Sequence, residues 1–184
     1  MATMIRVTTG TAKNKKLIAP NIEGFRAVQD VAKLALFSIL GDKIIGAECL
    51  DLFAGSGSVG IEALSRGAAY CDFVDENPKA VEAIEVNLRN CGFEENCEIH
   101  RKNAAKFTGD TDKKYDVIFA DPFYDDTKHV FLFSNIEMVL EDNGVVVFFH
   151  APETDIQANL AKTTLKIIDQ RKFGKSVFSV LRKG

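Results

Sequence analysis

The stretch Asp51-Leu52-Phe53-Ala54-Gly55-Ser56-Gly57-Ser58-Val59-Gly60 decides the fold, because it runs from a predicted strand (48–53) into a predicted helix (59–66). Its glycines satisfy the pattern Gly-x-Gly-x-x-Gly. Such glycines permit a tight turn, a close approach of the backbone to a ligand, and close packing of the helix on the strand. The N-terminus of the helix then offers free N–H groups and a partial positive charge to an anionic group.

Downstream of this stretch, short β-rich apolar runs alternate with amphipathic segments. Further strands are predicted at 70–75, 97–101, 115–120 and 144–149, and further helices at 77–90 and 130–141. Asn77 followed by Pro78 is a typical helix start. This alternation indicates a parallel sheet with helices on both faces. The tail differs, because 164–169 and 176–182 read as an antiparallel hairpin added to that sheet.

The segment before the glycine stretch predicts a helix and a small hairpin. The helix covers 27–40, and an apolar stripe is expected to face the core, formed by Val31, Leu34, Ala35 and Ile39. Residues 5–9 and 15–19 are expected to pair as a basic hairpin. We therefore divide the chain into a basic N-terminal extension, 1–25, and one main domain, 26–184.

The composition is that of a single globular domain, with 184 residues, 46% of them hydrophobic and 27% charged. The 4 cysteines form no Cys-x-x-Cys pair, so they are interpreted as apolar fillers in a reducing cytosol, and no metal site is expected. No role is assigned to His100, His129 and His150, since no partner for them is evident. The chain shows no signal peptide and no apolar run that spans a bilayer, which predicts a cytoplasmic protein away from membranes.

Charge is distributed unevenly along the chain. The formal net charge is −3, yet residues 1–33 sum to +4 and residues 166–184 to +5, which leaves −12 in the middle. Basic ends on an acidic body can form a patch for a polyanion. The alternative, that the terminal lysines are simply solvated, stays open at this point.

The predicted strand after the glycine stretch ends at Asp75. Its separation from the glycines is the one expected for an acid that accepts hydrogen bonds from ribose hydroxyls, so a nucleoside-containing cofactor is implied. Asp51 stands four residues before Gly55. A carboxylate there repels a pyrophosphate and attracts the ammonium of an amino-acid moiety, which favours S-adenosylmethionine over NAD. Alternatively, Asp51 caps backbone amides of the loop.

A second acidic loop, Asp121-Pro122-Phe123-Tyr124, follows the predicted strand 115–120. The carboxyl ends of strands are where ligands bind in open α/β sheets. Asp121 and the Pro122 carbonyl can each accept one N–H of an exocyclic amine, which directs its lone pair towards an electrophilic methyl group, while Tyr124 stacks on the base. The alternative is that Asp121 caps a turn and that the rings pack in the core.

With these motifs, the sequence resembles the RsmD-type 16S rRNA guanine-N2 methyltransferases, within the class I S-adenosylmethionine-dependent methyltransferases. The resemblance covers most of the chain. The specific part of the resemblance is the long motif formed by residues 51–57 and 60–68. Three other segments support it: Phe73-Val74-Asp75, Arg26 with Asp30 and residues 35–40, and Phe173-Gly174-Lys175.

The resemblance implies a Rossmann-like α/β fold, with a seven-stranded, mostly parallel sheet and an antiparallel last strand. It implies methylation of the exocyclic N2 of a guanine in 16S rRNA, on an assembling small ribosomal subunit in the cytoplasm. A monomer is expected, because no spare apolar surface stripe is evident. The expected catalytic residues are Asp121, Pro122, Phe123 and Tyr124. The expected S-adenosylmethionine contacts are Asp51, Phe53, Ala54, Gly55, Ser56, Gly57, Gly60, Asp75, Glu76, Asn103 and Ala104. The expected RNA contacts are Arg6, Lys13, Lys15, Lys16 and Arg26.

The chain departs from the family pattern at three positions. Phe123 stands where the family has a second proline, and Ala27 stands where it usually has proline. Asn103 occupies the place where an acid often contacts the adenine amino group, and its side-chain oxygen can accept that hydrogen. The base pocket is not readable, so an adenine-N6 methyltransferase of DNA or RNA remains an alternative. An NAD-dependent oxidoreductase or a non-catalytic nucleotide-binding module is the alternative from another class.

Overall fold

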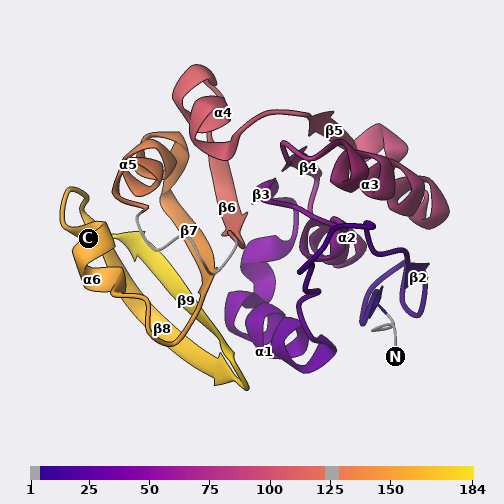
Figure 1. Ribbon diagram of the computed structural model, residues 1–184, viewed down its shortest axis with the longest axis horizontal. Coiled ribbons are helices and arrows are strands. Elements are labelled where there is room, and N and C mark those ends of the chain that lie inside the picture. The colour runs from indigo at the N-terminus through magenta and orange to yellow at the C-terminus, as the bar shows by residue number, and fades with distance from the viewer. Residues whose placement is uncertain (1–4, 123–128) are drawn as a thin grey trace.

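A seven-stranded sheet forms the centre of the protein (Figure 1). The structure is a computed structural model that describes residues 5–122 and 129–184. The strand order is β5-β4-β3-β6-β7-β9-β8. These strands are β3 (Glu48–Leu52), β4 (Tyr70–Val74), β5 (Cys97–His100), β6 (Tyr115–Ala120), β7 (Leu140–His150), β8 (Leu165–Phe173) and β9 (Ser176–Lys183).

The strands from β5 to β7 are parallel, and β9 runs antiparallel to both of its neighbours, β7 and β8. The predicted mostly parallel sheet with an antiparallel last strand is therefore confirmed. The hairpin predicted at the tail is confirmed as well. Its second strand, β9, is inserted between β7 and β8.

Three helices cover each face of the sheet. The apolar side chains of α1 (Asp30–Leu40), α2 (Ser58–Ser65) and α3 (Pro78–Cys91) belong to one buried cluster. Those of α4 (Ala104–Asp110), α5 (Val130–Val139) and α6 (Ile156–Leu160) belong to the other. Two short 3-10 turns, Gly41–Ile44 and Glu94–Asn96, precede β3 and β5. No helix of the described residues is long and apolar enough to cross a membrane.

The sequence predicted the long helices and missed two short ones. Neither α4 nor α6 was expected. The helix predicted at 27–40 begins at Asp30. Of its predicted core stripe, Ala35 and Ile39 pack against the core, but Val31 is 55% and Leu34 47% exposed. The residues that α1 buries are Ala32, Lys33, Leu36, Phe37 and Leu40. This helix carries apolar residues on two faces, so its periodicity alone could not select the side that meets the sheet.

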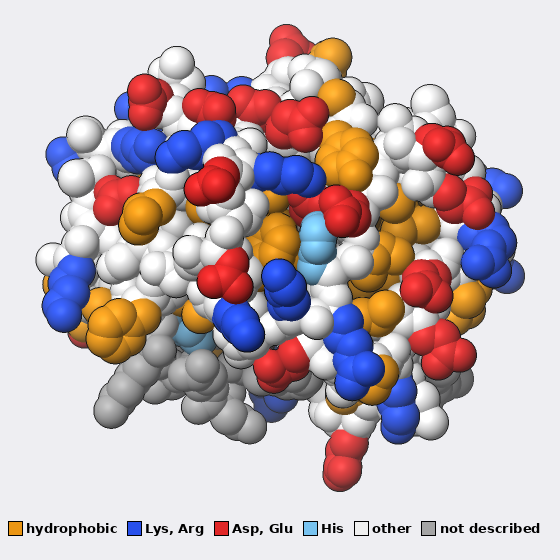
Figure 2. All heavy atoms as spheres, turned by 90° about the horizontal axis from the view of Figure 1, so that it is seen from above, with side chains coloured by type: hydrophobic (Ala, Val, Ile, Leu, Met, Phe, Trp, Pro, Cys, Tyr) orange, Lys and Arg blue, Asp and Glu red, His pale blue; other side chains and the backbone are white. Residues whose placement is uncertain are grey.

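The N-terminal segment folds as the predicted hairpin, with β1 (Ile5–Arg6) paired antiparallel to β2 (Lys16–Leu17). It packs on the main domain through Val7 and Leu17, which belong to the cluster of α1 to α3. A view onto the molecule from above Figure 1 shows acidic and basic side chains interspersed on that face (Figure 2). Neither sign of charge covers a continuous area there.

A buried carboxylate on α2 anchors this segment. Glu62 is fully buried and accepts hydrogen bonds from the backbone N–H groups of Thr8 (2.8 Å) and Thr9 (3.0 Å). Arg66 donates to it from the next turn at 2.9 Å, and the buried ammonium of Lys33 lies 3.6 Å away. A buried charge needs such partners, because its desolvation is costly. Glu62 therefore connects the N-terminal segment to α1 and α2.

The turn of the hairpin is fixed next to the C-terminal end of α2. Gly10 has a φ of +87°, and a Cβ atom there would lie 1.7 Å from the carbonyl oxygen of Ser65. The Thr11 N–H donates to that same carbonyl at 2.8 Å. Because α2 runs from the carboxyl end of β3 back to the start of β4, this turn lies at the amino end of the sheet.

We expect Glu62→Ala to lower the free energy of unfolding by about 3–5 kcal/mol, because it leaves the Lys33 ammonium buried without its main partner. Urea denaturation followed by circular dichroism measures this. Glu85→Ala, on the exposed side of α3, is the control and should change stability by less than about 0.5 kcal/mol. Equal effects of the two substitutions would contradict the anchoring role.

Candidate active site

The strand ends that carry the predicted motifs lie side by side. Register pairs place His100, Val74, Leu52, Ala120, Phe148, Ser179 and Gln170 in one row across the sheet. The glycine loop follows Leu52, Asp75 follows Val74, and Asp121 follows Ala120. The structure therefore brings the two predicted loops together at the carboxyl edge of three adjacent strands, β4, β3 and β6 (Figure 1).

The glycine loop is built from left-handed backbone conformations. Phe53, Gly55 and Gly57 have φ values of 57°, 57° and 72°. Such a conformation costs a non-glycine residue roughly 1–2 kcal/mol, so Phe53 is a strained position. Gly57 is the N-cap of α2. A Cβ atom at Gly60 would lie 2.4 Å from the Phe73 ring, so the predicted close packing of helix on strand is confirmed.

Two residues that the sequence analysis missed hold this loop in place. The Phe25 ring covers Gly55, since a Cβ atom there would lie 2.8 Å from it. Asn87 is fully buried, and its Nδ2 donates to the carbonyl oxygens of Ser56 (2.9 Å) and Ile18 (3.0 Å), while its Oδ1 accepts from the Ile18 N–H (2.8 Å). No local pattern marks either residue, because both act on partners that are distant in sequence.

Asp51 lies beneath the loop, with 3% of its surface exposed. Its carboxylate accepts a hydrogen bond from the Gly60 N–H at 2.9 Å. Burial raises the pKa of Asp51 well above its usual range, the Gly60 bond lowers it, and the charges of Asp121 and Asp75 raise it further. The structure shows Asp51 capping an amide in the first turn of α2, and its expected contact with the ammonium of a ligand stays a prediction.

Asp75 connects the glycine loop to the turn before α3. It accepts hydrogen bonds from the N–H groups of Gly55 and Asn77, both at 2.9 Å. Burial raises the pKa of Asp75, and these two bonds partly offset that rise. A carboxylate offers about four lone-pair sites, and Asp75 is partly exposed. It therefore keeps acceptor capacity for hydroxyl groups of a ligand.

The side-chain oxygen of Asn103 accepts from the N–H groups of Ala105 (3.1 Å) and Lys106 (3.3 Å), because Asn103 is the N-cap of α4. Its expected contact with an adenine amino group stays a prediction. Its Nδ2 donates to Glu76 at 3.2 Å. Ala104 is 3% exposed and packs in the cluster of α4 to α6, so its side chain does not face the site.

Asp121 follows β6, and its N–H donates to the Leu52 carbonyl at 3.3 Å. Leu52, the last residue of β3, therefore joins the start of the glycine loop to Asp121 by a backbone hydrogen bond. Burial raises the pKa of Asp121 to about 7, and the positive charge of Arg26 opposes this rise. Pro122 is buried. The predicted residues Phe123 and Tyr124 lie outside the described residues.

The predicted RNA contacts are spread along the N-terminal segment, and their role stays a prediction. Arg26 lies near Asp121, as its effect on that carboxyl group shows. Arg6 pairs with Asp30 at 2.8 Å. Lys13, Lys15 and Lys16 are exposed, and the turn that carries the first two follows Gly10, at the amino end of the sheet. The charge of Lys15 lowers the pKa of Cys91, the last residue of α3, which agrees with this placement.

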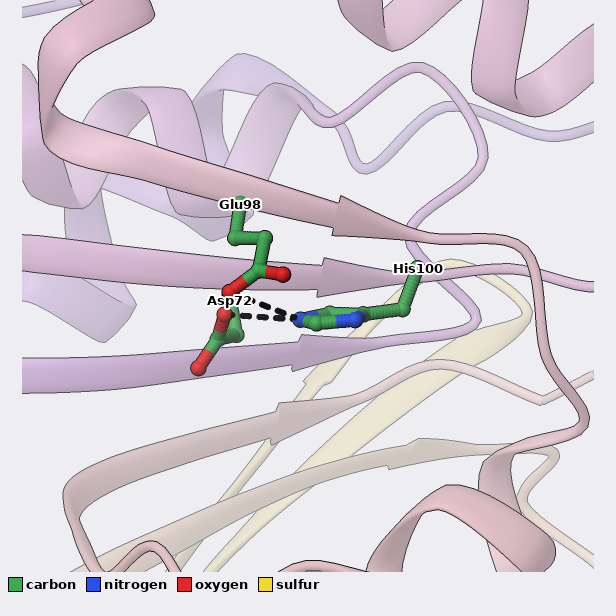
Figure 3. Close-up of side chains that lie close together, drawn as sticks. All are labelled: Asp72, Glu98 and His100. Atoms are coloured by element: carbon green, nitrogen blue, oxygen red, sulfur yellow. Dashed lines mark hydrogen bonds and ion pairs between the residues drawn. The ribbon is translucent and has the colours of Figure 1, made fainter.

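A separate charged cluster, Asp72, Glu98 and His100, lies on β4 and β5 (Figure 3). Asp72 is fully buried and accepts from His100 (2.8 Å), Lys113 (3.0 Å) and Tyr115 (2.8 Å). Because Lys113 already supplies a positive charge, we interpret the cluster as an ion-pair network between strands. The expectation that no histidine has a partner is wrong for His100, and also for His150, whose Nε2 lies 2.9 Å from the Ser179 hydroxyl.

Comparisons with known proteins agree with this architecture. A family model described as "Conserved hypothetical protein 95" matches residues 5–182. "Putative rRNA methyltransferase YlbH" of Bacillus subtilis is 32% identical over 97% of this chain and 99% of its own. "Ribosomal RNA small subunit methyltransferase D" of Escherichia coli is 33% identical over 76% of this chain and 68% of its own. The structure described as "Putative methyltransferase yhhF" from Escherichia coli superposes with a TM-score of 0.83 at 25% identity, covering 98% of both chains.

The raised pKa of Asp121 predicts a pH-dependent cost to stability. The pKa of Asp121 is about 3.9 in the unfolded state and is higher in the folded state. At pH values between these two pKa values, the folded state therefore binds more protons than the unfolded state does. The destabilisation caused by ionised Asp121 is therefore absent below pH 4, grows as pH rises towards about 7, and is constant above it. We expect Asp121→Asn to be more stable than the unmodified protein at pH 8, but not at pH 4.

Urea denaturation of both proteins at the two pH values measures this difference. Asp112→Asn, at an exposed carboxyl group before β6, should show no such dependence on pH. A gain in stability from Asp121→Asn that is the same at both pH values would contradict the assignment.

Proposed function

The chain belongs to the RsmD-type family described as conserved hypothetical protein 95, and on that premise we propose that it methylates the exocyclic N2 amine of a guanine in 16S rRNA. We place its substrate in the assembling small ribosomal subunit of the cytoplasm. The observation that carries the proposal is the bond between the Asp121 N–H and Leu52. This bond sets a candidate amine acceptor directly beside a glycine loop of the type that binds nucleosides.

The residues at this edge fit S-adenosylmethionine as the methyl donor. Asp75 is partly exposed and keeps lone pairs for the two ribose hydroxyls, as described above. The glycine loop lies beside it, with Gly55 under the Phe25 ring and Gly57 as the N-cap of α2. S-adenosylmethionine, when bound, supplies an electrophilic methyl group on a sulfonium.

Asp121 and the Pro122 carbonyl are proposed to accept the two N–H groups of the guanine amine. Ionised Asp121 then stabilises the positive charge that develops on the amine nitrogen as its lone pair attacks the methyl carbon. Bound S-adenosylmethionine would supply the methyl group and leave as a neutral thioether, and the Asp121 carboxylate would take the proton that the methylated nitrogen loses. Much of the acceleration comes from holding the amine in line, which rigid strand ends achieve. Tyr124 is proposed to stack on the base.

The deciding experiment is radiolabelled methyl transfer to undermodified small subunits, to deproteinised rRNA and to DNA in parallel. The modified base is then identified by mass spectrometry after nuclease digestion. We expect N2-methylguanine, formed in small-subunit RNA. Label in the N6 of adenine, or label in DNA alone, would contradict the proposal.

Asp121→Ala should lower the rate of methyl transfer about 100-fold or more, because a charged acceptor aimed at the transition state is lost. Its affinity for S-adenosylmethionine, measured by calorimetry, should stay close to that of the unmodified protein. A variant that keeps normal turnover would exclude Asp121 as a catalytic residue.

Asp75→Ala should weaken the binding of S-adenosylmethionine about 10- to 100-fold, because hydrogen bonds to a charged group contribute about 1.5–3 kcal/mol. Isothermal calorimetry measures this change. Glu82→Ala, on the exposed side of α3, is the matched control and should leave the affinity unchanged. Equal affinities of the Asp75 and Glu82 variants would show that Asp75 does not contact the donor.

A further inference from the structure

Two groups of cations flank the carboxyl edge of the sheet. On one side, Arg101 and Lys102 follow the last residue of β5, and Lys106 lies in the first turn of α4. On the other side, Lys172 and Lys175 lie at the turn between β8 and β9. Strand spacing of about 4.8 Å places each outer strand about 14 Å from β6, because three spacings separate them on either side. Asp121 is therefore midway between the two groups.

The β8–β9 turn extends beyond the level of Asp121. Ala120 is in register with Phe148, and Val177 pairs with His150, two residues further along β7. Lys172 pairs with Val177, so it lies past the end of β6, and Lys175 lies further out in the turn. These two lysines consequently project from the edge where the glycine loop and Asp121 lie.

The flanking cations are available to a ligand. All five side chains belong to exposed residues. Among the residues that the structure describes, none of the five forms an ion pair. Another basic side chain near this edge, Arg171, is already paired with Asp169 at 3.0 Å. A phosphate that approaches either flank therefore meets a cation without first displacing a carboxylate.

The centre of the edge is mainly acidic, with Arg26 as a cation near Asp121. Asp75 and Asp121 follow β4 and β6 there, and their charges raise the pKa of Asp51, which lies beneath the glycine loop. Such a centre favours an uncharged base over a phosphate. Enzymes that modify a base commonly take it out of its stack into a pocket. The charge pattern suits that geometry, with phosphates held at the sides and one base directed inward.

We propose that RNA lies across this edge, with its phosphates on Arg101, Lys102 and Lys106 at one flank and on Lys172 and Lys175 at the other. This inference rests on the proposed function and specifies the surface that the substrate uses. It differs from the expectation that the N-terminal lysines hold the RNA, because the turn that carries Lys13 and Lys15 packs on Ser65 at the amino end of the sheet.

The test compares four double variants that each change the net charge by the same amount. Arg101→Glu with Lys102→Glu removes the first flank, and Lys172→Glu with Lys175→Glu removes the second. The matched control is Lys166→Glu with Arg182→Glu, a register pair at the other end of the β8–β9 hairpin. Lys13→Glu with Lys15→Glu tests the N-terminal turn. Binding of unmodified 16S rRNA transcript is measured by filter retention over a range of salt concentrations.

We expect each flank variant to bind the transcript at least about 10-fold more weakly at low salt. The slope of log affinity against log salt should become shallower by about 1.4, because two single-strand phosphate contacts are lost at about 0.7 each. The control and the N-terminal variant should keep the slope of the unmodified protein. Calorimetry should give all four variants the same affinity for S-adenosylmethionine.

Two results would overturn the inference while the proposed function stands. In one, only the N-terminal variant binds the transcript more weakly and with a shallower dependence on salt. In the other, the Lys166 and Arg182 control loses as much as the flank variants, which would indicate a general effect of charge. If instead the unmodified protein neither binds nor methylates the transcript or the small subunit, the proposed function fails, and the inference fails with it.

Discussion

The close packing of α2 against β3 and β4 is the constraint on which the rest of the site depends. Gly60 has no side chain, so the helix approaches the Phe73 ring until its N–H bonds to buried Asp51. That bond offsets part of the cost of placing a carboxylate under the glycine loop. The position of the helix then fixes the left-handed turn at Gly55 and Gly57, and the N–H of Gly55 in turn binds Asp75.

The same helix organises the N-terminal segment through its other side. Glu62 holds the backbone of Thr8 and Thr9 in a buried ionic network with Lys33 and Arg66. From there the chain returns past Asn87 and covers the glycine loop with Phe25. The N-terminal segment, which composition marks only as basic, therefore covers the glycine loop, and it also places the cation Arg26 near Asp121, the proposed catalytic residue.

Much of the fold was readable from the sequence, because it depends on local patterns. Alternating apolar runs identified the strands, and the glycines identified the turn into α2. The site was readable only where a motif lies at a strand end, as at Asp75 and Asp121. The sequence did not show features that are set by packing. The helix that Asn103 caps, α4, was missed because it is too short to show periodicity. The buried side of α1 is decided by its packing against the sheet, and the position of Lys13 by the packing of Gly10 on Ser65.

The insertion of β9 between β7 and β8 has a consequence for how the chain reaches its native state. A ribosome makes β8 before β9, yet the edge strand has no partner in the sheet until β9 has joined β7. β8 therefore joins the sheet only through β9, whatever the order in which the rest of the sheet forms. Until the hairpin docks, β7 has an unpaired edge rich in valine and phenylalanine, and unpaired edges of this kind favour aggregation.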